Sequence, residues 1–221
     1  MDKRFWAIIG IIILVFGGAL VLNNRSKSAS TVAATNHIKG NLSSKVTLLE
    51  YGDYQCPACG EFYPVTHEVQ QLYDAKIRFQ FRNLPLSSIH PNAFAGARAA
   101  EAADMQGKFW EMHDLLYENQ DVNGQSGWVA SQNVLNDYFV SFAKQLSLNV
   151  TKFKADYASA TVNNRINADI DAFKAIGDEM STPTFYLDGK KIDNSALVDA
   201  KGQPSLAAFS KLLDAALAQT K

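Results

Sequence analysis

The stretch YGDYQCPACGEFYPV, residues 51–65, contains both cysteines of the chain, Cys56 and Cys59. Two cysteines separated by two residues occur in zinc sites, in structural disulfides and in redox-active pairs. The residues around the pair, and the elements they predict, distinguish these three kinds of site.

A zinc site and a structural disulfide both fit this pair poorly. A structural zinc site takes four ligands, usually two cysteine pairs or one cysteine pair and one histidine pair. The chain has no second cysteine pair, and its histidines are scattered: His37, His67, His90 and His113. A disulfide between near neighbours closes a very short loop, where its entropic effect is smallest. We therefore favour a redox-active pair and predict no bound metal or cofactor.

The pattern around the pair predicts a strand followed by a helix. Residues 46–51 form a short apolar run typical of a buried strand, and a helix is predicted from near Cys56. Pro57 suits the first turn of a helix, where its missing N–H is not needed. The helix should bury the apolar residues at helical spacing, which are Phe62, Val65, Val69 and Leu72.

This placement gives the two sulfurs different properties. The positive end of a helix stabilises a thiolate, so the pKa of Cys56 should fall below its usual value of about 8.5. Cys59 lies one turn further in and should be more buried. We predict that Cys56 is the exposed nucleophile and that Cys59 is the resolving thiol.

The rest of the folded part continues the α/β pattern. Apolar and polar side chains alternate in residues 77–82, so a second strand should pair in parallel with the first. Residues 91–177 have a helical pattern. The last elements predicted are strands at residues 184–187 and 191–192 around an Asp188-Gly189 turn, and a helix at residues 205–217. This order predicts a mixed sheet with an inserted block of helices.

The N-terminus has a different composition. Residues 5–22 are an unbroken apolar run, which as a helix measures roughly 27 Å and spans a bilayer core of about 30 Å. A cleavable signal is the alternative, but its apolar part is normally shorter and followed by a small-residue cleavage site. We predict an uncleaved anchor at residues 1–22, a flexible linker at residues 23–45, and a single-pass protein of the cell membrane whose catalytic part is extracytoplasmic.

The charge of the chain limits its partners. The formal net charge is −1, and no cluster of Lys and Arg is present in the sequence. Nucleic acid requires a concentrated basic face, so we predict no nucleic-acid partner. We expect a monomer.

Three motifs together resemble the DsbA-like branch of the thioredoxin superfamily, which consists of exported thiol–disulfide oxidoreductases. They are EYGDYQCPACGEFYP, KFWEMHDLLYENQ and STPTFYLDGKKI, in the order that the branch has. The resemblance extends from about residue 46 to the C-terminus, and it is strongest to membrane-tethered bacterial members. It implies a thioredoxin-like domain at residues 46–86 and 178–221, with an inserted helical domain at residues 87–177.

The resemblance also implies roles for individual residues. Pro183 would be a cis-proline against the two sulfurs, and the backbone of Thr182 would bind an extended substrate strand. The alternative for Pro183 is an ordinary proline at the start of a strand. Glu50 matches a buried carboxylate that would relay the proton for Cys59. The alternative for Glu50 is an exposed strand end.

Four other residues have predicted roles. Arg78 and Arg82, on the next strand, are both candidates for an ion pair with Glu50. We interpret His113 as a packing residue of a helix, and His90, followed by proline, as the start of a helix.

The predicted function is an oxidase that introduces disulfides into reduced exported proteins. The resemblance implies that a quinone-linked membrane oxidase would reoxidise it. Strong oxidants of this branch carry a hydrogen-bond donor between the cysteines, and Ala58 has none. We therefore predict a potential between thioredoxin, at about −270 mV, and DsbA, at about −120 mV. The alternatives are a reductase, for example in cytochrome maturation, and a non-catalytic peptide-binding or chaperone module.

Overall fold

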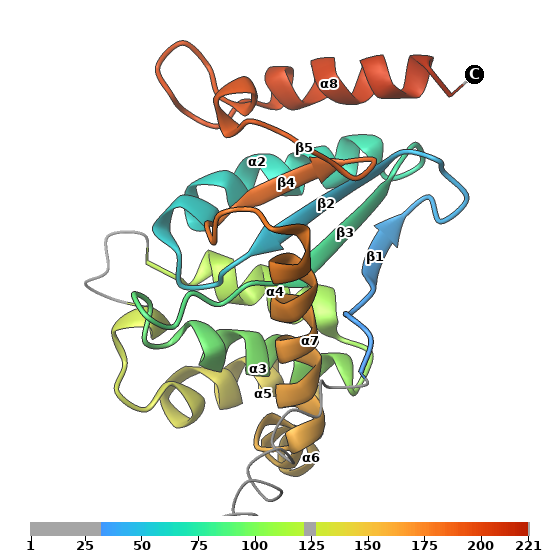
Figure 1. Ribbon diagram of the computed structural model, residues 1–221. Coiled ribbons are helices and arrows are strands. Elements are labelled where there is room, and N and C mark those ends of the chain that lie inside the picture. Colours follow the sequence, from blue (N-terminus) through green and yellow to red (C-terminus); the bar gives the residue numbers. More distant parts are fainter. Residues whose placement is uncertain (1–31, 122–126, 221) are drawn as a thin grey trace, which may run out of the picture. The chain divides into compact units, whose positions relative to one another are not determined.

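Five strands form one mixed sheet in the computed structural model, which describes residues 32–121 and 127–220 (Figure 1). The strands are β1 (His37–Gly40), β2 (Thr47–Gly52), β3 (Arg78–Asn83), β4 (Thr184–Leu187) and β5 (Lys190–Lys191). Their order across the sheet is β1-β3-β2-β4-β5. Only β2 and β3 pair in parallel, and the other neighbours are antiparallel. The predicted α/β class with a mixed sheet is confirmed.

The helix α2 (Pro57–Tyr73) connects the two parallel strands, as predicted. Phe62 and Val69 are buried, but Leu72 is 52% exposed, so its predicted place on the buried face is wrong. Tyr73, one position later, continues the buried face at the spacing of three and four residues that an α-helix requires.

The predicted hairpin is confirmed at β4 and β5. Asp188 and Gly189 have φ angles of 50° and 78°. Positive φ at both central positions belongs to the two-residue turn whose twist matches that of antiparallel strands. The second strand begins directly after this turn, at Lys190.

The chain between β3 and β4 is mostly helical. Its helices are α3 (Ala93–Asp104), α4 (Phe109–Glu118), α5 (Val140–Gln145), α6 (Val150–Tyr157) and α7 (Ala160–Ile176), with short turns η2 (Trp128–Ala130) and η3 (Leu135–Phe139). After β5 come η4 (Asn194–Leu197) and α8 (Leu206–Ala218). The predicted block of inserted helices and the predicted last helix are confirmed.

The two faces of the sheet are covered by different helices. Phe185 of β4 packs with Phe62 of α2 and Phe209 of α8 on one face. On the other face Tyr51 of β2 packs against Phe173 of α7. Figure 1 shows α2 and α8 above the sheet in this view, with α3, α5 and α6 at the opposite end. The sheet is therefore buried on both faces, and the β2–α2 connection lies where the sheet meets the inserted helices.

The prediction of a flexible linker at residues 23–45 is wrong where the structure describes it. β1 lies in this segment and pairs with β3, with His37 opposite Phe81. Thr35 donates to Asp169 through its backbone N–H at 2.6 Å and through its hydroxyl at 2.7 Å. These bonds to distant parts of the chain order a segment whose own composition is polar. Residues 23–31 lie outside the described residues.

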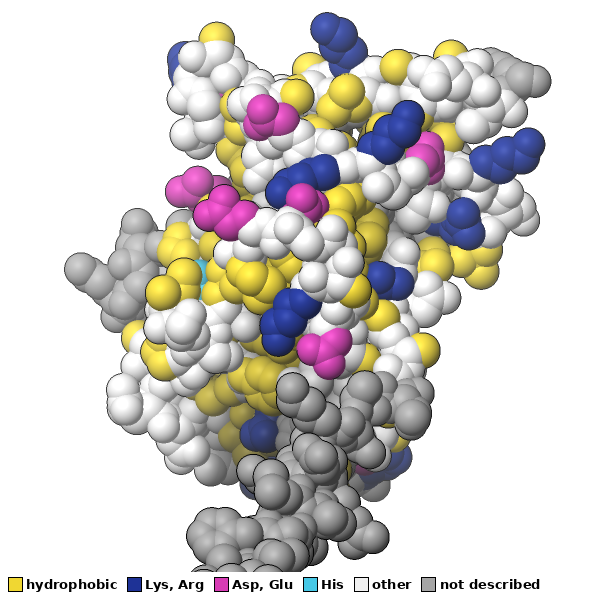
Figure 2. All heavy atoms as spheres, viewed as in Figure 1, with side chains coloured by type: hydrophobic (Ala, Val, Ile, Leu, Met, Phe, Trp, Pro, Cys, Tyr) yellow, Lys and Arg dark blue, Asp and Glu magenta, His cyan; other side chains and the backbone are white. Residues whose placement is uncertain are grey.

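Residues 32–45 belong, together with both predicted domains, to one compact unit, Val32–Lys221. Among residues 32–121 and 127–220, no helix is long and apolar enough to cross a membrane. The anchor predicted at residues 1–22 lies outside this described part. Figure 2 shows basic and acidic side chains interspersed on one face of the molecule.

Candidate redox site

Cys56 and Cys59 lie at the start of α2, as predicted. Cys56 is the residue that caps the helix, and Pro57 is its first residue. The backbone N–H of Cys56 donates to the Asp53 carbonyl at 3.0 Å, and the N–H of Gly60 donates to the Cys56 carbonyl at 3.1 Å. Both cysteines are free thiols.

The accessibility of the two sulfurs differs less than predicted. Cys59 is fully buried, but Cys56 is itself only 6% exposed, so the expectation of a well-exposed nucleophile is wrong. The segment before β4 lies against it, because the Cys56 thiol donates to the Thr182 carbonyl at 3.4 Å. The Cys56 sulfur is therefore partly covered by the segment that precedes β4.

The surroundings shift the two thiols in opposite directions. The pKa of Cys56 is lowered to about 6, chiefly because the Cys59 thiol donates a hydrogen bond to the thiolate. The Thr182 side chain and the Cys59 backbone N–H also lower the pKa of Cys56, whereas burial and the charge of Asp53 raise it. Burial raises the pKa of Cys59 well above its ordinary value. At neutral pH the pair therefore holds one thiolate, at Cys56, and one thiol.

The peptide bond between Thr182 and Pro183 is cis, and β4 begins at the next residue. Pro183 is thus both a cis-proline, as the resemblance implies, and a proline directly before a strand. The Thr182-Pro183 segment faces the Cys56 sulfur, as the sequence predicts.

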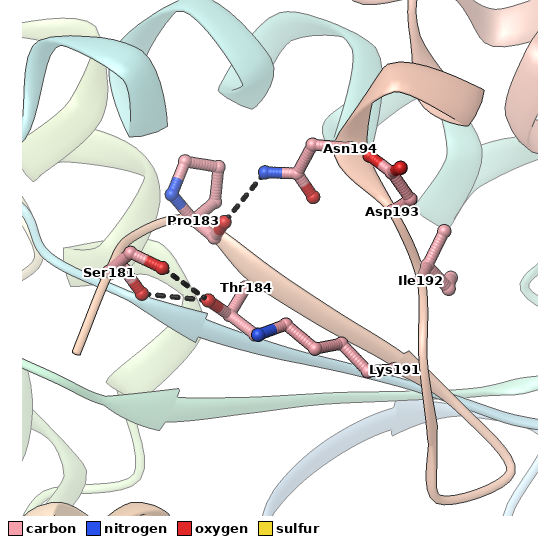
Figure 3. Close-up of a pocket in the computed structure, with 7 residues that line it drawn as sticks. All are labelled: Ser181, Pro183, Thr184, Lys191, Ile192, Asp193 and Asn194. Carbon is pink, nitrogen blue, oxygen red and sulfur yellow. Dashed lines mark hydrogen bonds between the residues drawn. The ribbon is translucent and has the colours of Figure 1, made fainter. Parts of the chain in front are cut away.

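A pocket of about 440 Å³ opens beside this proline (Figure 3). Its lining comes from the segment before β4, from β4, and from the chain after β5: Ser181, Pro183, Thr184, Lys191, Ile192, Asp193 and Asn194. The Asn194 amide donates to the Pro183 carbonyl at 2.8 Å, and the Thr184 hydroxyl donates to the Ser181 carbonyl at 2.7 Å. These bonds fix the backbone of the segment, so the pocket wall next to Cys56 is held in place.

Glu50 is buried, which excludes the alternative of an exposed strand end. Only 2% of it is exposed, and burial raises the pKa of its carboxyl to about 8. It pairs across the sheet with Phe81 and Phe185, and its charge raises the pKa of Cys59. The carboxyl therefore lies close enough to act on the buried thiol.

The predicted ion pair of Glu50 with an arginine is absent from the described part of the chain. Arg82 pairs with Tyr51 in the register, and Arg78 pairs with Thr47. Paired residues point to the same face, and successive residues alternate, so both arginines lie on the face opposite Glu50. The Arg82 guanidinium instead donates to the Tyr51 hydroxyl at 2.9 Å.

Asp53 and His90 join the site, although the sequence did not predict it. Asp53 is 1% exposed, and its Oδ2 lies 2.7 Å from Nδ1 of His90. His90 does not begin a helix, because α3 starts three residues later with Asn92 as its cap. The two residues are far apart in sequence and form no local motif, so only the tertiary structure reveals the pair.

Gln120 is a second residue that the sequence analysis missed. It is 1% exposed and donates to the carbonyls of Tyr54 and Cys56, at 2.7 and 2.8 Å. Its Oε1 would lie 2.0 Å from a Cβ at position 60, so the glycine there makes room for it. The glycine after the second cysteine was the available signal. The end of α4 thus holds the turn that carries Cys56.

His113 is a packing residue, as predicted. It is 1% exposed and lies 3.1 Å from the Tyr54 hydroxyl through Nδ1. Burial lowers its pKa well below the ordinary value, so the ring stays neutral.

One group in the described part of the chain has the residue types of a metal site: His37, Glu101 and Asp104. Arg165 already supplies positive charge there, because it lies 3.3 Å from Glu101 and 2.6 Å from Asp104. The Arg165 guanidinium thus balances the charge of the two carboxylates. The group forms an ionic network that needs no metal ion to balance it.

Comparison with known proteins gives a family and a set of similar folds. The family profile described as thioredoxin matches residues 32–215. Among curated proteins, the Na(+)/H(+) antiporter NhaA 3 of Salinispora tropica is 33% identical over 175 residues, which are 79% of this chain and 25% of the antiporter. The antiporter NhaA 1 of Salinispora arenicola is 34% identical over the same shares. The chain thus spans about a quarter of these relatives.

Solved structures of oxidoreductases share the fold. Oxidised BdbD from Bacillus subtilis has a TM-score of 0.66 at 21% identity, covering 85% of this chain and 98% of BdbD. MdbA, a thiol-disulfide oxidoreductase from Actinomyces oris, has a TM-score of 0.64 at 22% identity, covering 81% of this chain and 85% of MdbA. A thioredoxin-like oxidoreductase from Silicibacter pomeroyi has a TM-score of 0.58 at 25% identity, covering 82% and 91%. The structural neighbours are DsbA-like, and the fold is thioredoxin-like.

Proposed function

The chain belongs to the thioredoxin family, and from this premise we propose that it is a thiol–disulfide oxidoreductase that oxidises protein thiols through Cys56 and Cys59. One observation carries the proposal. The pKa of Cys56 is lowered to about 6 while that of Cys59 is raised, and the Cys56 sulfur contacts the carbonyl of Thr182, whose peptide bond to Pro183 is cis. Such an arrangement separates an attackable sulfur from a resolving one.

The reaction begins with the Cys56–Cys59 disulfide. A substrate thiolate attacks the Cys56 sulfur, forms a mixed disulfide and expels Cys59 as a thiolate. A second substrate thiolate attacks the substrate sulfur of the mixed disulfide and expels Cys56. The substrate gains a disulfide and loses two electrons, and the two cysteines receive them.

The proton balance assigns a role to Glu50. Expelled Cys59 is buried and has a raised pKa, so it must take up a proton as it leaves. The Glu50 carboxyl, whose pKa is about 8, is protonated at neutral pH and is the proposed donor. Cys56 needs no proton on leaving, because the Cys59 thiol hydrogen-bonds to its thiolate.

Substrate binding is assigned to the segment beside the sulfurs. An extended peptide would bond to the backbone of Thr182 and lie against Pro183. The Pro183 carbonyl already accepts from Asn194, and the backbone of Thr182 is the proposed binding group. The adjoining pocket would receive a side chain of the substrate.

The setting of the protein is part of the proposal. The substrates would be reduced exported proteins, and a quinone-linked membrane oxidase would reoxidise the pair. An anchor at residues 1–22 would keep a monomeric extracytoplasmic domain close to that partner. Relatives named as antiporters support a membrane setting. Antiport itself is not proposed, because this chain spans only about a quarter of them.

The equilibrium potential of the Cys56–Cys59 pair tests the direction of the reaction. We expect a value between about −270 mV and about −120 mV, measured in glutathione buffers by the fraction of free thiol. The oxidised chain should also form disulfides in a reduced dithiol peptide. A potential more reducing than about −270 mV would assign the chain to the reductases.

The stability of the reduced form should depend on pH. The Cys56 pKa is about 6 in the folded protein against an ordinary 9.0, so thiolate formation stabilises the reduced fold. That stabilisation is complete above the ordinary value and is lost as pH falls through about 6. The oxidised form has no titrating thiol. The Tm of the reduced form should therefore fall relative to that of the oxidised form as the pH is lowered from about 8 to about 5. A constant Tm difference over this range would contradict the lowered pKa.

A further inference from the structure

Two segments that are distant in sequence meet at the turn that carries Cys56. Asp53 Oδ2 lies 2.7 Å from Nδ1 of His90 and accepts from the Leu86 backbone N–H at 2.9 Å. Asp53 Oδ1 accepts from the Gln55 N–H at 2.8 Å, and the Gln55 side chain accepts from the Asn92 N–H at 2.5 Å. The loop before α3 is thus fastened to residues on the N-terminal side of Cys56.

The bonds identify the nitrogen of His90 that carries a hydrogen. An ionised carboxylate only accepts hydrogen bonds, so Nδ1 of His90 carries the hydrogen and donates it to Asp53. The bond to Asp53 raises the pKa of His90, whereas burial lowers it. His90 is 16% exposed at its side chain and Asp53 is fully covered, so the carboxylate has little water to screen it.

The pair is electrostatically coupled to the reactive sulfur. The charge of Asp53 raises the pKa of Cys56, and the Cys56 thiolate raises the pKa of His90. Four groups therefore act on the Cys56 sulfur or its charge: Asp53 and Cys59 from the same turn, and Thr182 and His90 from distant segments. Two of them, Cys59 and Thr182, stabilise the thiolate directly. Asp53 opposes it.

We propose that Asp53 and His90 are positioning residues that set the reactivity of Cys56. The positive charge that His90 carries when protonated offsets the negative charge that Asp53 places beside the thiolate, while Asp53 holds the loop and the turn together. The purpose of this device rests on the proposed oxidoreductase function. Ala58, between the two cysteines, has no polar group. In this proposal His90, from a distant loop, supplies the positively charged group instead.

The coupling predicts that two substitutions shift the pKa of Cys56 in opposite directions. His90→Gln keeps a donor toward Asp53 but removes the positive charge, so the pKa of Cys56 should rise. Asp53→Asn removes the negative charge, so the pKa of Cys56 should fall. A purely structural role would loosen the turn in both variants and would not give shifts of opposite sign.

The experiment uses the reduced full chain and the pH dependence of Cys56 alkylation by iodoacetamide. Cys59 is buried with a raised pKa, so it stays unmodified over the range needed. Each single charge change should move the pKa of Cys56 by about half a unit or more, upward for His90→Gln and downward for Asp53→Asn. The double variant should return close to the parent value.

His67→Gln is the matched control, because His67 lies on α2 and is a third exposed at its side chain. It should leave the pKa of Cys56 unchanged. Shifts in the same direction for the two single variants, or no rise in His90→Gln, would overturn the inference. If Asp53→Asn does not fold, His90→Gln alone decides.

This readout is independent of turnover. A chain that shows the opposite shifts but does not oxidise dithiol peptides would refute the proposed function and leave the coupling standing. A chain that oxidises peptides without the shifts would refute only the coupling.

Discussion

Replacing Cys56 with Ser is expected to reduce dithiol oxidation by the chain to the uncatalysed background. The hydroxyl of serine is a far weaker nucleophile and leaving group at neutral pH than a thiolate whose pKa is about 6. No other cysteine can take its place, since the sequence has only Cys56 and Cys59. The measurement is the rate at which a reduced dithiol peptide forms its disulfide with the oxidised chain. Oxidation that persists in Cys56→Ser would support a binding module in which the disulfide is incidental.

The companion variant, Cys59→Ser, is expected to trap a mixed disulfide instead. Cys56 would attack a disulfide peptide, release one peptide thiolate and stay bound to the other half, because no resolving thiol remains. The serine hydroxyl still hydrogen-bonds to the Cys56 thiolate, so the first attack should proceed. Mass spectrometry of the intact chain would detect the adduct.

The control for both variants is Ser141→Ala, an exposed position of α5. It should oxidise the peptide at the parent rate and form no lasting adduct. An adduct in Cys56→Ser but not in Cys59→Ser would reverse the proposed roles of the two cysteines.

The elements that the sequence predicted well are those whose signals are local. The β2–α2 connection carries a strand pattern, a proline at the first helical position and the two cysteines within a short stretch. The β4–β5 hairpin has its Asp-Gly turn, and α8 has its Ser205 cap. In each case the sequence spacing alone determines the backbone conformation.

The features that the sequence did not predict depend on partners far along the chain. The composition around β1 predicts a linker because it is polar and has no hydrophobic periodicity, yet the strand is ordered by pairing with β3. The Asp53–His90 contact and the Gln120 bonds to the Cys56 turn likewise join separate segments. Arg78 and Arg82 lie on the strand next to Glu50 but point to the opposite face of the sheet, so closeness in the predicted strands does not bring them to its carboxyl.

The burial of Glu101 is the clearest case of information absent from the local pattern. It lies in α3 within a run of alanines, where a glutamate is ordinarily solvated. In the fold it is fully buried. Its Oε1 lies 2.7 Å from His37 Nε2 and accepts from Asn83 at 2.8 Å, and its Oε2 lies 3.3 Å from Arg165. One carboxylate therefore joins β1, β3 and α7 to α3.

Glu101→Ala is expected to lower the free energy of unfolding by about 3–5 kcal/mol, the usual cost of removing one partner of a buried ionic network. The change would remove the Glu101 acceptor from His37, Asn83 and Arg165 in a site that water reaches poorly, although Arg165 keeps Asp104 and Asn83 keeps Asp169. Urea unfolding of the reduced chain, followed by tryptophan fluorescence, measures the loss. β1 should be the first element to loosen, because its His37 contact to Glu101 is a side-chain bond that joins it to the inserted helices.

Glu111→Ala is the matched control, since it removes the same group from the same block of helices at an exposed position. Glu111 pairs with Lys108 at 2.6 Å, and both side chains are more than two-fifths exposed. Such surface pairs contribute about 0–1 kcal/mol, so the control should be nearly neutral. Equal losses in the two variants would mean that the buried network contributes no more than a surface pair. A large loss in Glu101→Ala alone would show that the segment before β2 is an integral part of the fold, held by charge as well as by strand pairing.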